Sequence, residues 1–133
     1  MTLYEDADHW TAHLPPRWMA DRDGDTSVLV DPAGPGVVQI TEVRATEPIP
    51  DFKLKAMAED DRHPPTVEVT PERWGDFSGW GVRRFKQNSF ITQLYLCRDR
   101  DLIYVTYVCD EGDEDLEADA LREILESLRW TGE

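Results

Sequence analysis

Histidine and cysteine, the residue types that most often hold metals or attack substrates, are scarce in this sequence. It contains three histidines and two cysteines among 133 residues. His9 and His13 share one face of a predicted strand over residues 9–14, but the rise of a strand separates them by about 13 Å. One ion cannot bridge that distance, and a structural zinc site uses four Cys or His ligands grouped in pairs. His63 lies in a proline-rich turn, so we predict no metal site.

Cys97 is the strongest candidate nucleophile, because the guanidinium of Arg98 beside it could lower its pKa. No histidine is expected near this thiol, and no serine stands in the context of a nucleophile elbow. No glycine-rich loop leads from a strand into a helix, so a dinucleotide phosphate site is not expected. The sequence therefore predicts a protein that is not an enzyme and that uses no cofactor.

The acidic segment 21–25 resembles a calcium-binding loop. An EF-hand needs an oxygen ligand at position 1 and a bidentate glutamate at position 12. With Gly24 aligned as the invariant glycine, these positions hold Met19 and Val30, which cannot coordinate calcium. We interpret the segment as the tip of a hairpin whose carboxylates face solvent.

Charge limits the partners more than any motif does. The formal net charge is −14, and because phosphate backbones are bound by neutralising lysines and arginines, we expect no nucleic acid partner. Anionic membrane surfaces are disfavoured for the same reason. Acidity either keeps the protein soluble or serves to attract a basic protein partner. The N-terminus shows neither a signal peptide nor a transit peptide, and no apolar stretch is long enough to span a membrane, so we expect a cytoplasmic protein.

The length and the pattern of apolar residues predict a single α+β domain over residues 1–133, with an antiparallel sheet and two helices packed on it. Asp23–Gly24 predicts a hairpin turn that places Trp18 opposite Leu29 and Met19 opposite Val28. Asp51 is expected to cap the first helix. The expected strands are 9–14, 17–22, 25–30, 37–44, 66–70, 82–87, 89–97 and 102–109, the helices are 51–62 and 113–129, and residues 74–81 are expected to form a turn or bulge.

The hairpin formed by residues 89–97 and 102–109 gives the strongest strand signal. With Asp99–Arg100 as its turn, alternation predicts two apolar faces. One face collects Phe90, Leu94, Leu96, Ile103, Val105 and Tyr107, and the other collects Ile91, Tyr95, Leu102, Tyr104 and Val108. The same alternation places Cys97 and Cys109 on opposite faces and at opposite ends, too far apart for a disulfide, so we predict two free thiols.

Aromatic residues supply the candidate partner-binding site. The chain has five tryptophans, of which Trp18 and Trp130 are expected to anchor the core. Trp74, Phe77 and Trp80 cluster among glycines, and Tyr95 and Tyr104 are expected to be cross-strand neighbours. These five aromatic side chains either pack as structure or contact a partner, since tryptophan and tyrosine dominate interface hot spots.

Three short segments resemble one known family. LPPRW (residues 14–18), LIYVTYVC (102–109) and ILESLRW (124–130) are similar to the opening, last strand and closing helix of small bacterial domains with the fold of the photosystem II subunit PsbP and the eukaryotic Ran-release factor. The resemblance implies an α/β/α sandwich of PsbP-like type. It also implies non-enzymatic binding, and it carries no catalytic residue onto this sequence.

Three functions remain open from the sequence. The first is a protein-binding module of adaptor, secretion-chaperone or toxin-immunity type, whose protein partner is expected to be basic or hydrophobic. The second is a small carboxylate- or metal-dependent hydrolase, which needs a deep pocket holding carboxylates with perturbed pKa values. The third is a carrier of a small ligand or lipid, which needs an enclosed apolar cavity between sheet and helix.

Overall fold

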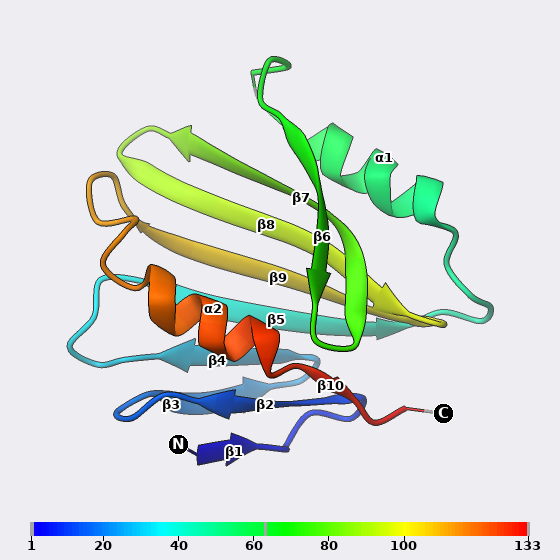
Figure 1. The fold of residues 1–133 in the computed structure, drawn as a ribbon, viewed down its shortest axis with the longest axis horizontal. Coiled ribbons are helices and arrows are strands. Elements are labelled where there is room, and N and C mark those ends of the chain that lie inside the picture. Colours follow the sequence, from blue (N-terminus) through cyan, green and yellow to red (C-terminus); the bar gives the residue numbers. More distant parts are fainter. Residues whose placement is uncertain (1, 63, 133) are drawn as a thin grey trace.

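The computed structural model describes residues 2–62 and 64–132, which form two antiparallel sheets and two helices (Figure 1). The larger sheet has seven strands in the order β3-β4-β5-β9-β8-β7-β6, and the smaller has three in the order β1-β2-β10. The predicted α+β class is confirmed. The elements are β1 (Thr2–Tyr4), β2 (Trp10–Leu14), β3 (Met19–Asp23), β4 (Thr26–Val30), β5 (Val37–Arg44), α1 (Asp51–Asp61), β6 (Val69–Trp74), β7 (Phe77–Lys86), β8 (Ser89–Arg98), β9 (Asp101–Asp110), α2 (Ala118–Glu126) and β10 (Arg129–Trp130).

The β8–β9 hairpin lies inside the large sheet and defines its two faces. Its turn is Asp99–Arg100, with Arg98 opposite Asp101, as predicted. The face that we call inner carries the buried residues Leu94, Leu96, Ile103, Val105 and Tyr107, and the outer face carries Ile91, Tyr95, Leu102, Tyr104 and Val108. Both cysteines are free thiols, and they lie on opposite faces, which confirms both predictions.

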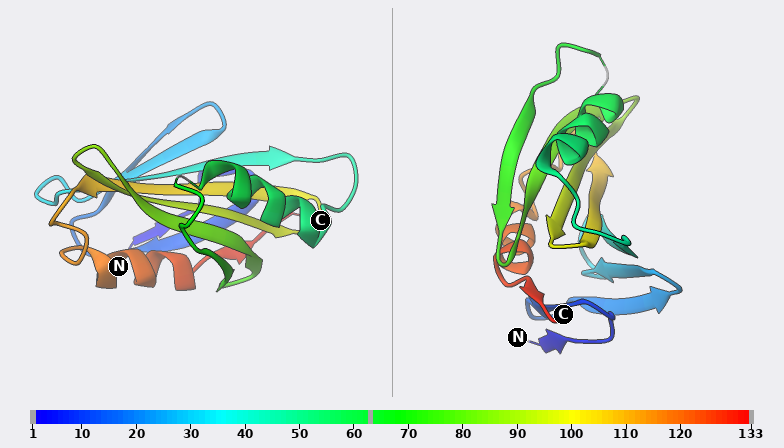
Figure 2. Two further views of the ribbon diagram at one scale, coloured as in Figure 1. Left: turned by 90° about the horizontal axis from the view of Figure 1, so that it is seen from above. Right: turned by 90° about the vertical axis from the view of Figure 1, so that its right-hand side faces the viewer.

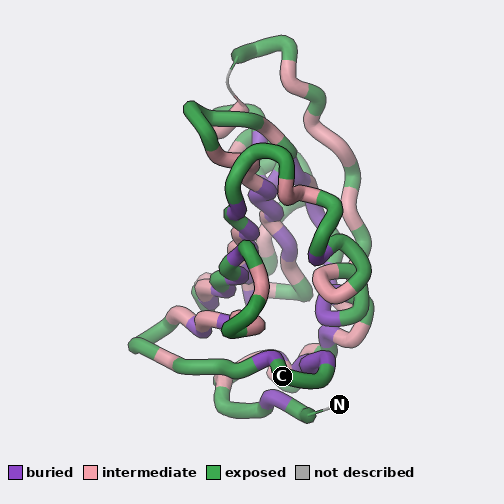
Figure 3. Tube along the Cα trace, turned by 90° about the vertical axis from the view of Figure 1, so that its left-hand side faces the viewer, coloured by how far each residue is buried: buried purple, intermediate pink, exposed green. Residues whose placement is uncertain are grey.

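The inner face is covered by α2 and by the three-stranded sheet, whose strand β2 pairs with both β1 and β10. Period-two alternation in β2 and helical spacing in α2 point apolar side chains at the same core. The buried contributors from these elements are Trp10, Ala12, Leu14, Ile124 and Leu125, and Leu128, just after α2, joins them. Burial along the chain follows this layering, with buried segments facing the interior and exposed segments in the connecting turns (Figure 3).

Helix α1 packs on the other face of the sheet, against β6, β7 and β8. Leu54 and Ala58, one turn apart, are its buried residues. The two helices therefore lie on opposite sides of the curved sheet (Figure 2). Because α1 packs at the β6 side, the outer face of β3, β4 and β5 keeps no helical cover within the described residues.

Two turns differ from the prediction. In the β3–β4 hairpin the central residues are Gly24 and Asp25, so Met19 lies opposite Val30 rather than Val28. Only Gly24 has a positive φ, +61°, as in a type II′ turn, which takes glycine at its first central position. Between β6 and β7, the expected turn over 74–81 is wrong, because both strands run into it and leave only Gly75 and Asp76 between them.

Strand β6 also passes through Pro71, where the sequence predicted no strand. A proline cannot donate to a sheet ladder, but it is tolerated on an edge strand, and β6 is the edge of the large sheet. The prediction therefore ended this strand too early. The short strands β1 and β10 were not predicted.

Both helices begin differently from the prediction. Pro50 precedes α1 as its cap, and Asp51 is the first helical residue, with no capping hydrogen bond from its side chain. Helix α2 begins at Ala118, and the expected first turn from residue 113 is instead a series of turns. Leu116, an apolar residue of the predicted helix 113–129, is 70% exposed. The helix starts later because the next residue, Glu117, turns its carboxylate inward, away from a capping role.

Candidate functional site

The outer face of the large sheet carries an apolar row that crosses five strands. Met19 on β3 lies opposite Val30 on β4, and Val37 on β5 lies opposite Val108 on β9, which in turn lies opposite Ile91 on β8. Val30 and Val37 are the next positions beyond the Leu29–Val38 pair of the β4–β5 ladder. We call these five residues the outer apolar row.

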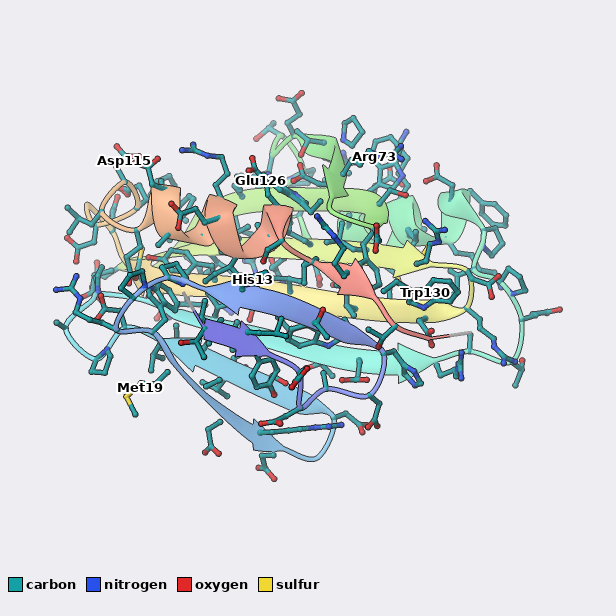
Figure 4. All side chains as sticks on the ribbon, turned by 60° about the horizontal axis from the view of Figure 1, so that its bottom comes forward. His13, Met19, Arg73, Asp115, Glu126 and Trp130 are labelled. Atoms are coloured by element: carbon teal, nitrogen blue, oxygen red, sulfur yellow. The ribbon has the colours of Figure 1, made fainter. Side chains whose placement is uncertain are left out.

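The row is accessible. Met19 is 60% exposed, Val108 39% and Val37 36%. Figure 4 shows the Met19 side chain projecting from the body of the protein at the β3 edge. Val43, on the outer face of β5, adds a further apolar side chain that is 51% exposed. An antiparallel sheet face that meets water normally presents polar side chains, so this row is the unusual feature of the surface.

The charges beside the row are acidic on β3 and β9 and basic on β7, where Arg84 lies opposite Ile91 and Lys86 lies opposite Ser89. The strand register directs Asp21 and Asp23 of β3 and Asp110 of β9 outward, on the same face as the row. None of the outward positions of β3, β4, β5 and β9, all within the described residues, holds a lysine or arginine. The face is therefore apolar along the row and acidic on β3 and β9, and its basic residues lie beyond the row on β7.

Three of the five predicted partner-binding aromatics lie on the outer face, in another cross-strand row. Trp80 lies opposite Tyr95, and Tyr95 lies opposite Tyr104. The two tyrosine rings are tilted against each other with centroids 4.8 Å apart. Trp80 is engaged by α1, since its Nε1 donates to Asp51 at 3.0 Å and the Lys55 ammonium lies 4.9 Å from its ring. The tyrosines, half-buried, lie between α1 and the outer apolar row.

The other two predicted aromatics lie elsewhere. Phe77 is 1% exposed and belongs to the core, so its prediction as a partner contact is wrong. Phe77 is the first residue of β7, directly after the tight turn, and this position directs its ring to the inner face of the sheet. Trp74 is half-buried at the end of β6 and faces a pocket on the inner side of the sheet. The sequence had grouped Trp74, Phe77 and Trp80 as neighbours, but a hairpin divides them between the two faces.

This inner pocket lies between α2 and strands β6 to β9 and has a volume of about 320 Å³. Its sheet side is formed by Trp74, Arg83, Phe90, Thr92 and Tyr107. Its helix side is formed by Glu114, Asp115, Ala118, Leu121, Arg122 and Leu125. The pocket is open to solvent, unlike the enclosed cavity expected for a carrier.

A buried carboxylate organises the sheet side of the inner pocket. Glu72 accepts hydrogen bonds from both terminal nitrogens of Arg83, at 3.1 and 3.2 Å, and from Trp74 Nε1 at 3.0 Å. Thr70 Oγ1 also donates to it, at 2.6 Å. Burial raises the pKa of the Glu72 carboxyl, but these hydrogen bonds outweigh burial and hold its pKa below the ordinary value.

A second buried carboxylate fixes α2 to the sheet. Glu117, 7% exposed, accepts hydrogen bonds on Oε1 from the Tyr107 hydroxyl at 2.8 Å and from the Gly36 amide at 2.9 Å. Its Oε2 has no partner within the described residues. A Cβ on Gly34 would meet Oε2, so a larger residue there would force the Glu117 carboxylate to shift. Burial, together with the Glu117 carboxylate, raises the pKa of Tyr107 far above its ordinary value.

Metal and nucleophile chemistry gain no support. No group of three or more His, Cys, Asp or Glu within residues 2–62 and 64–132 could hold a metal ion, and His63 lies outside the described residues. Burial raises the pKa of the Cys97 thiol, whereas the sequence suggested that Arg98 could lower it. Arg98 instead lies over the Trp130 ring, at 5.3 Å. No described helix combines the length and apolar character that crossing a membrane requires.

Sequence reasoning missed both the outer apolar row and the polar side of the inner pocket. The signal for the row was present in residues 37–44, where Val37 and Val43 alternate with the buried Val38, Ile40 and Glu42. The Arg83–Thr92 pair in the inner pocket is a cross-strand neighbour pair. It could not be found without the register of β7 on β8.

Comparisons with known proteins show the fold alone. No protein-family model matches the sequence, and no curated protein matches it. A protein from Bacteroides thetaiotaomicron VPI-5482 is similar in structure with a TM-score of 0.70 at 11% identity, over 93% of this chain. The chain spans 46% of that protein's length. LpqN of Mycobacterium tuberculosis, described as involved in cell envelope biogenesis, is similar with a TM-score of 0.65 at 14% identity, over 98% of this chain and 90% of LpqN.

Proposed function

We propose that this chain is a non-enzymatic protein-binding module that binds a basic protein partner on its outer face. The observation that carries the proposal is the outer apolar row, three of whose members are at least 36% exposed. Contiguous exposed apolar side chains on a soluble protein mark interaction surfaces. Isolated exposed apolar residues would carry no such meaning.

The sign of the charge selects the partner. Asp21, Asp23 and Asp110 on β3 and β9, together with the net charge of −14, favour a partner segment in which apolar residues are flanked by lysine or arginine. The same charge opposes a second copy of this chain as the occupant. The finer assignment, to an adaptor, secretion chaperone or immunity protein of the PsbP-like group, stays a prediction.

The test compares the wild type with a variant altered only on the outer face. Met19→Arg combined with Val108→Arg places two positive charges within the row, where they repel a basic partner. Leu116→Arg is the matched control, since Leu116 is also exposed (70%) but precedes α2. Affinity capture from an extract of the source organism, quantified by mass spectrometry, identifies any protein retained by the wild type and the control and lost by the double variant.

That protein is then purified and its affinity measured directly. We expect the double variant to bind at least tenfold more weakly than the wild type, and we expect the association rate of the wild type to fall as salt is added. The proposal fails if every protein captured by the wild type is captured equally by the double variant. It also fails if the purified partner binds both forms with the same Kd.

A further inference from the structure

We propose that the inner pocket binds a small uncharged amphipathic molecule, with an apolar body and a head group that accepts hydrogen bonds. The pocket lies on the opposite face of the sheet from the outer apolar row. The inference therefore goes beyond the proposed function and does not depend on it.

The pocket offers an apolar surface for the body of such a ligand. Trp74 and Phe90 from the sheet and Leu121 and Leu125 from α2 line it on facing sides. Leu125 is only 2% exposed, so it forms part of the floor. A volume of about 320 Å³ lies at the lower end of the range for small-molecule sites.

Two polar groups on the sheet side define the head group. Thr92 is 3% exposed and lines the pocket, and none of the side-chain hydrogen bonds among the described residues uses its hydroxyl. The Thr92 hydroxyl oxygen is not one of the fully buried, unpaired atoms of the described residues, so it is open to the pocket, where a ligand can pair with it. Arg83, its cross-strand neighbour, also lines the pocket.

Glu72 holds the Arg83 guanidinium in place without using all of it. One N–H on each terminal nitrogen points to the Glu72 carboxylate. A guanidinium has five N–H donors, so the Nε donor and one donor on each terminal nitrogen are left for a ligand. A carbonyl or hydroxyl oxygen can accept from Arg83 and pair with Thr92.

The charges around the pocket disfavour an anionic head group, and its hydrogen-bond donors disfavour a cationic one. Glu72 neutralises Arg83, and Asp119 pairs with Arg122 at 2.6 Å. Glu114 and Asp115 on the helix side then leave the lining with a negative excess, which repels a carboxylate or phosphate. An ammonium group has no lone pair to accept from Arg83 or Thr92. A neutral acceptor satisfies both constraints.

The test uses three probes that share one apolar body: 3-phenylpropanamide, 3-phenylpropanoate and 3-phenylpropylammonium. Each is titrated at pH 7 by calorimetry into the intact chain, with backbone amide NMR shifts recorded in parallel to locate the site. We expect the amide to bind with the lowest Kd, at least fivefold below the other two. Its largest shift changes should fall on β7, β8 and α2.

Two variants separate this pocket from unspecific binding. Ala118→Trp fills the pocket from an exposed position of α2 and should abolish amide binding, whereas Glu126→Trp, exposed on the same helix and outside the lining, should not. Thr92→Val should raise the Kd of the amide roughly two- to tenfold through loss of one hydrogen bond. Thr106→Val on the outer face of β9 should leave it unchanged. The inference is overturned if no probe binds, if a charged probe binds best, or if Ala118→Trp retains the amide.

Discussion

Removing the buried Glu117 carboxylate should loosen α2 from the sheet, and the structure sets the size of the effect. In Glu117→Ala, the Tyr107 hydroxyl and the Gly36 amide both lose a charged acceptor, which they reach at 2.8 and 2.9 Å. A hydrogen bond to a charged group contributes about 1.5–3 kcal/mol. The burial of Oε2 without a partner already costs free energy in the wild type. We therefore expect a net loss of about 2–4 kcal/mol in the free energy of unfolding.

Glu117→Gln distinguishes lost hydrogen bonds from lost packing. The amide oxygen of glutamine still accepts from Tyr107 and Gly36, and the uncompensated negative charge is gone. We expect this variant to lose less than half of what Glu117→Ala loses. A double-mutant cycle of Tyr107→Phe with Glu117→Ala should give a coupling of about 1.5–3 kcal/mol, the range for one charge-assisted hydrogen bond.

The assay is equilibrium unfolding in urea followed by tryptophan fluorescence and by circular dichroism, whose transitions must coincide for a two-state analysis. Surface substitutions generally change stability by less than about 0.5 kcal/mol, and Glu123→Ala, exposed on α2, provides that baseline. A loss below about 1 kcal/mol for Glu117→Ala would refute the reasoning. So would a coupling close to zero, because the Tyr107–Glu117 contact would then contribute nothing.

Three further predictions concern other parts of the fold. Glu72→Gln should destabilise the protein at neutral pH, because the folded state lowers the pKa of Glu72 and so favours its charged form. The difference in stability from the wild type should shrink as pH falls through that folded pKa, which urea unfolding between pH 7 and pH 3 can measure. Gly79→Ala should be severely destabilising, since its Cβ would lie 1.8 Å from a backbone oxygen of the neighbouring strand. Gly24→Ala should cost only about 1 kcal/mol in thermal unfolding, because its Cβ would meet nothing within 4 Å and the cost comes from the φ of +61°. Cys97 and Cys109 should react with a thiol reagent at pH 7 far more slowly in the native protein than in urea, because burial raises the pKa of both thiols. Fast labelling of either cysteine in the native state would contradict this prediction.

The sequence predicted those parts of the fold in which short-range patterns and packing agree. Strict alternation in residues 89–97 and 102–109 was enough to give the turn, the register and both faces of the β8–β9 hairpin. It was also enough to separate Cys97 from Cys109. These strands lie inside the sheet, where their alternation is enforced by burial on the inner face.

Prediction failed where a long-range contact decided the outcome. The start of α2 depends on Glu117 reaching Tyr107 and Gly36, and none of these contacts is visible in a run of acidic residues. The inner pocket depends on residues of four strands and one helix, so no local pattern shows it. The separation of Trp74 and Phe77 from Trp80 depends on a two-residue turn. The glycine-rich sequence predicted a turn in this region but not its position.

The pairing of β10 with β2 has a consequence for how the chain is made. Trp130 lies opposite Trp10, so β10 completes a layer whose other strands, β1 and β2, come more than 100 residues earlier in the sequence. On the ribosome, Trp10 and the other apolar residues of β2 emerge early and must wait for α2 and β10 before they are covered. Contacts so distant in sequence also form slowly. The newly made chain therefore exposes an apolar strand until α2 and β10 have been made, and in that interval it depends on its acidic charge or on a chaperone to remain unaggregated.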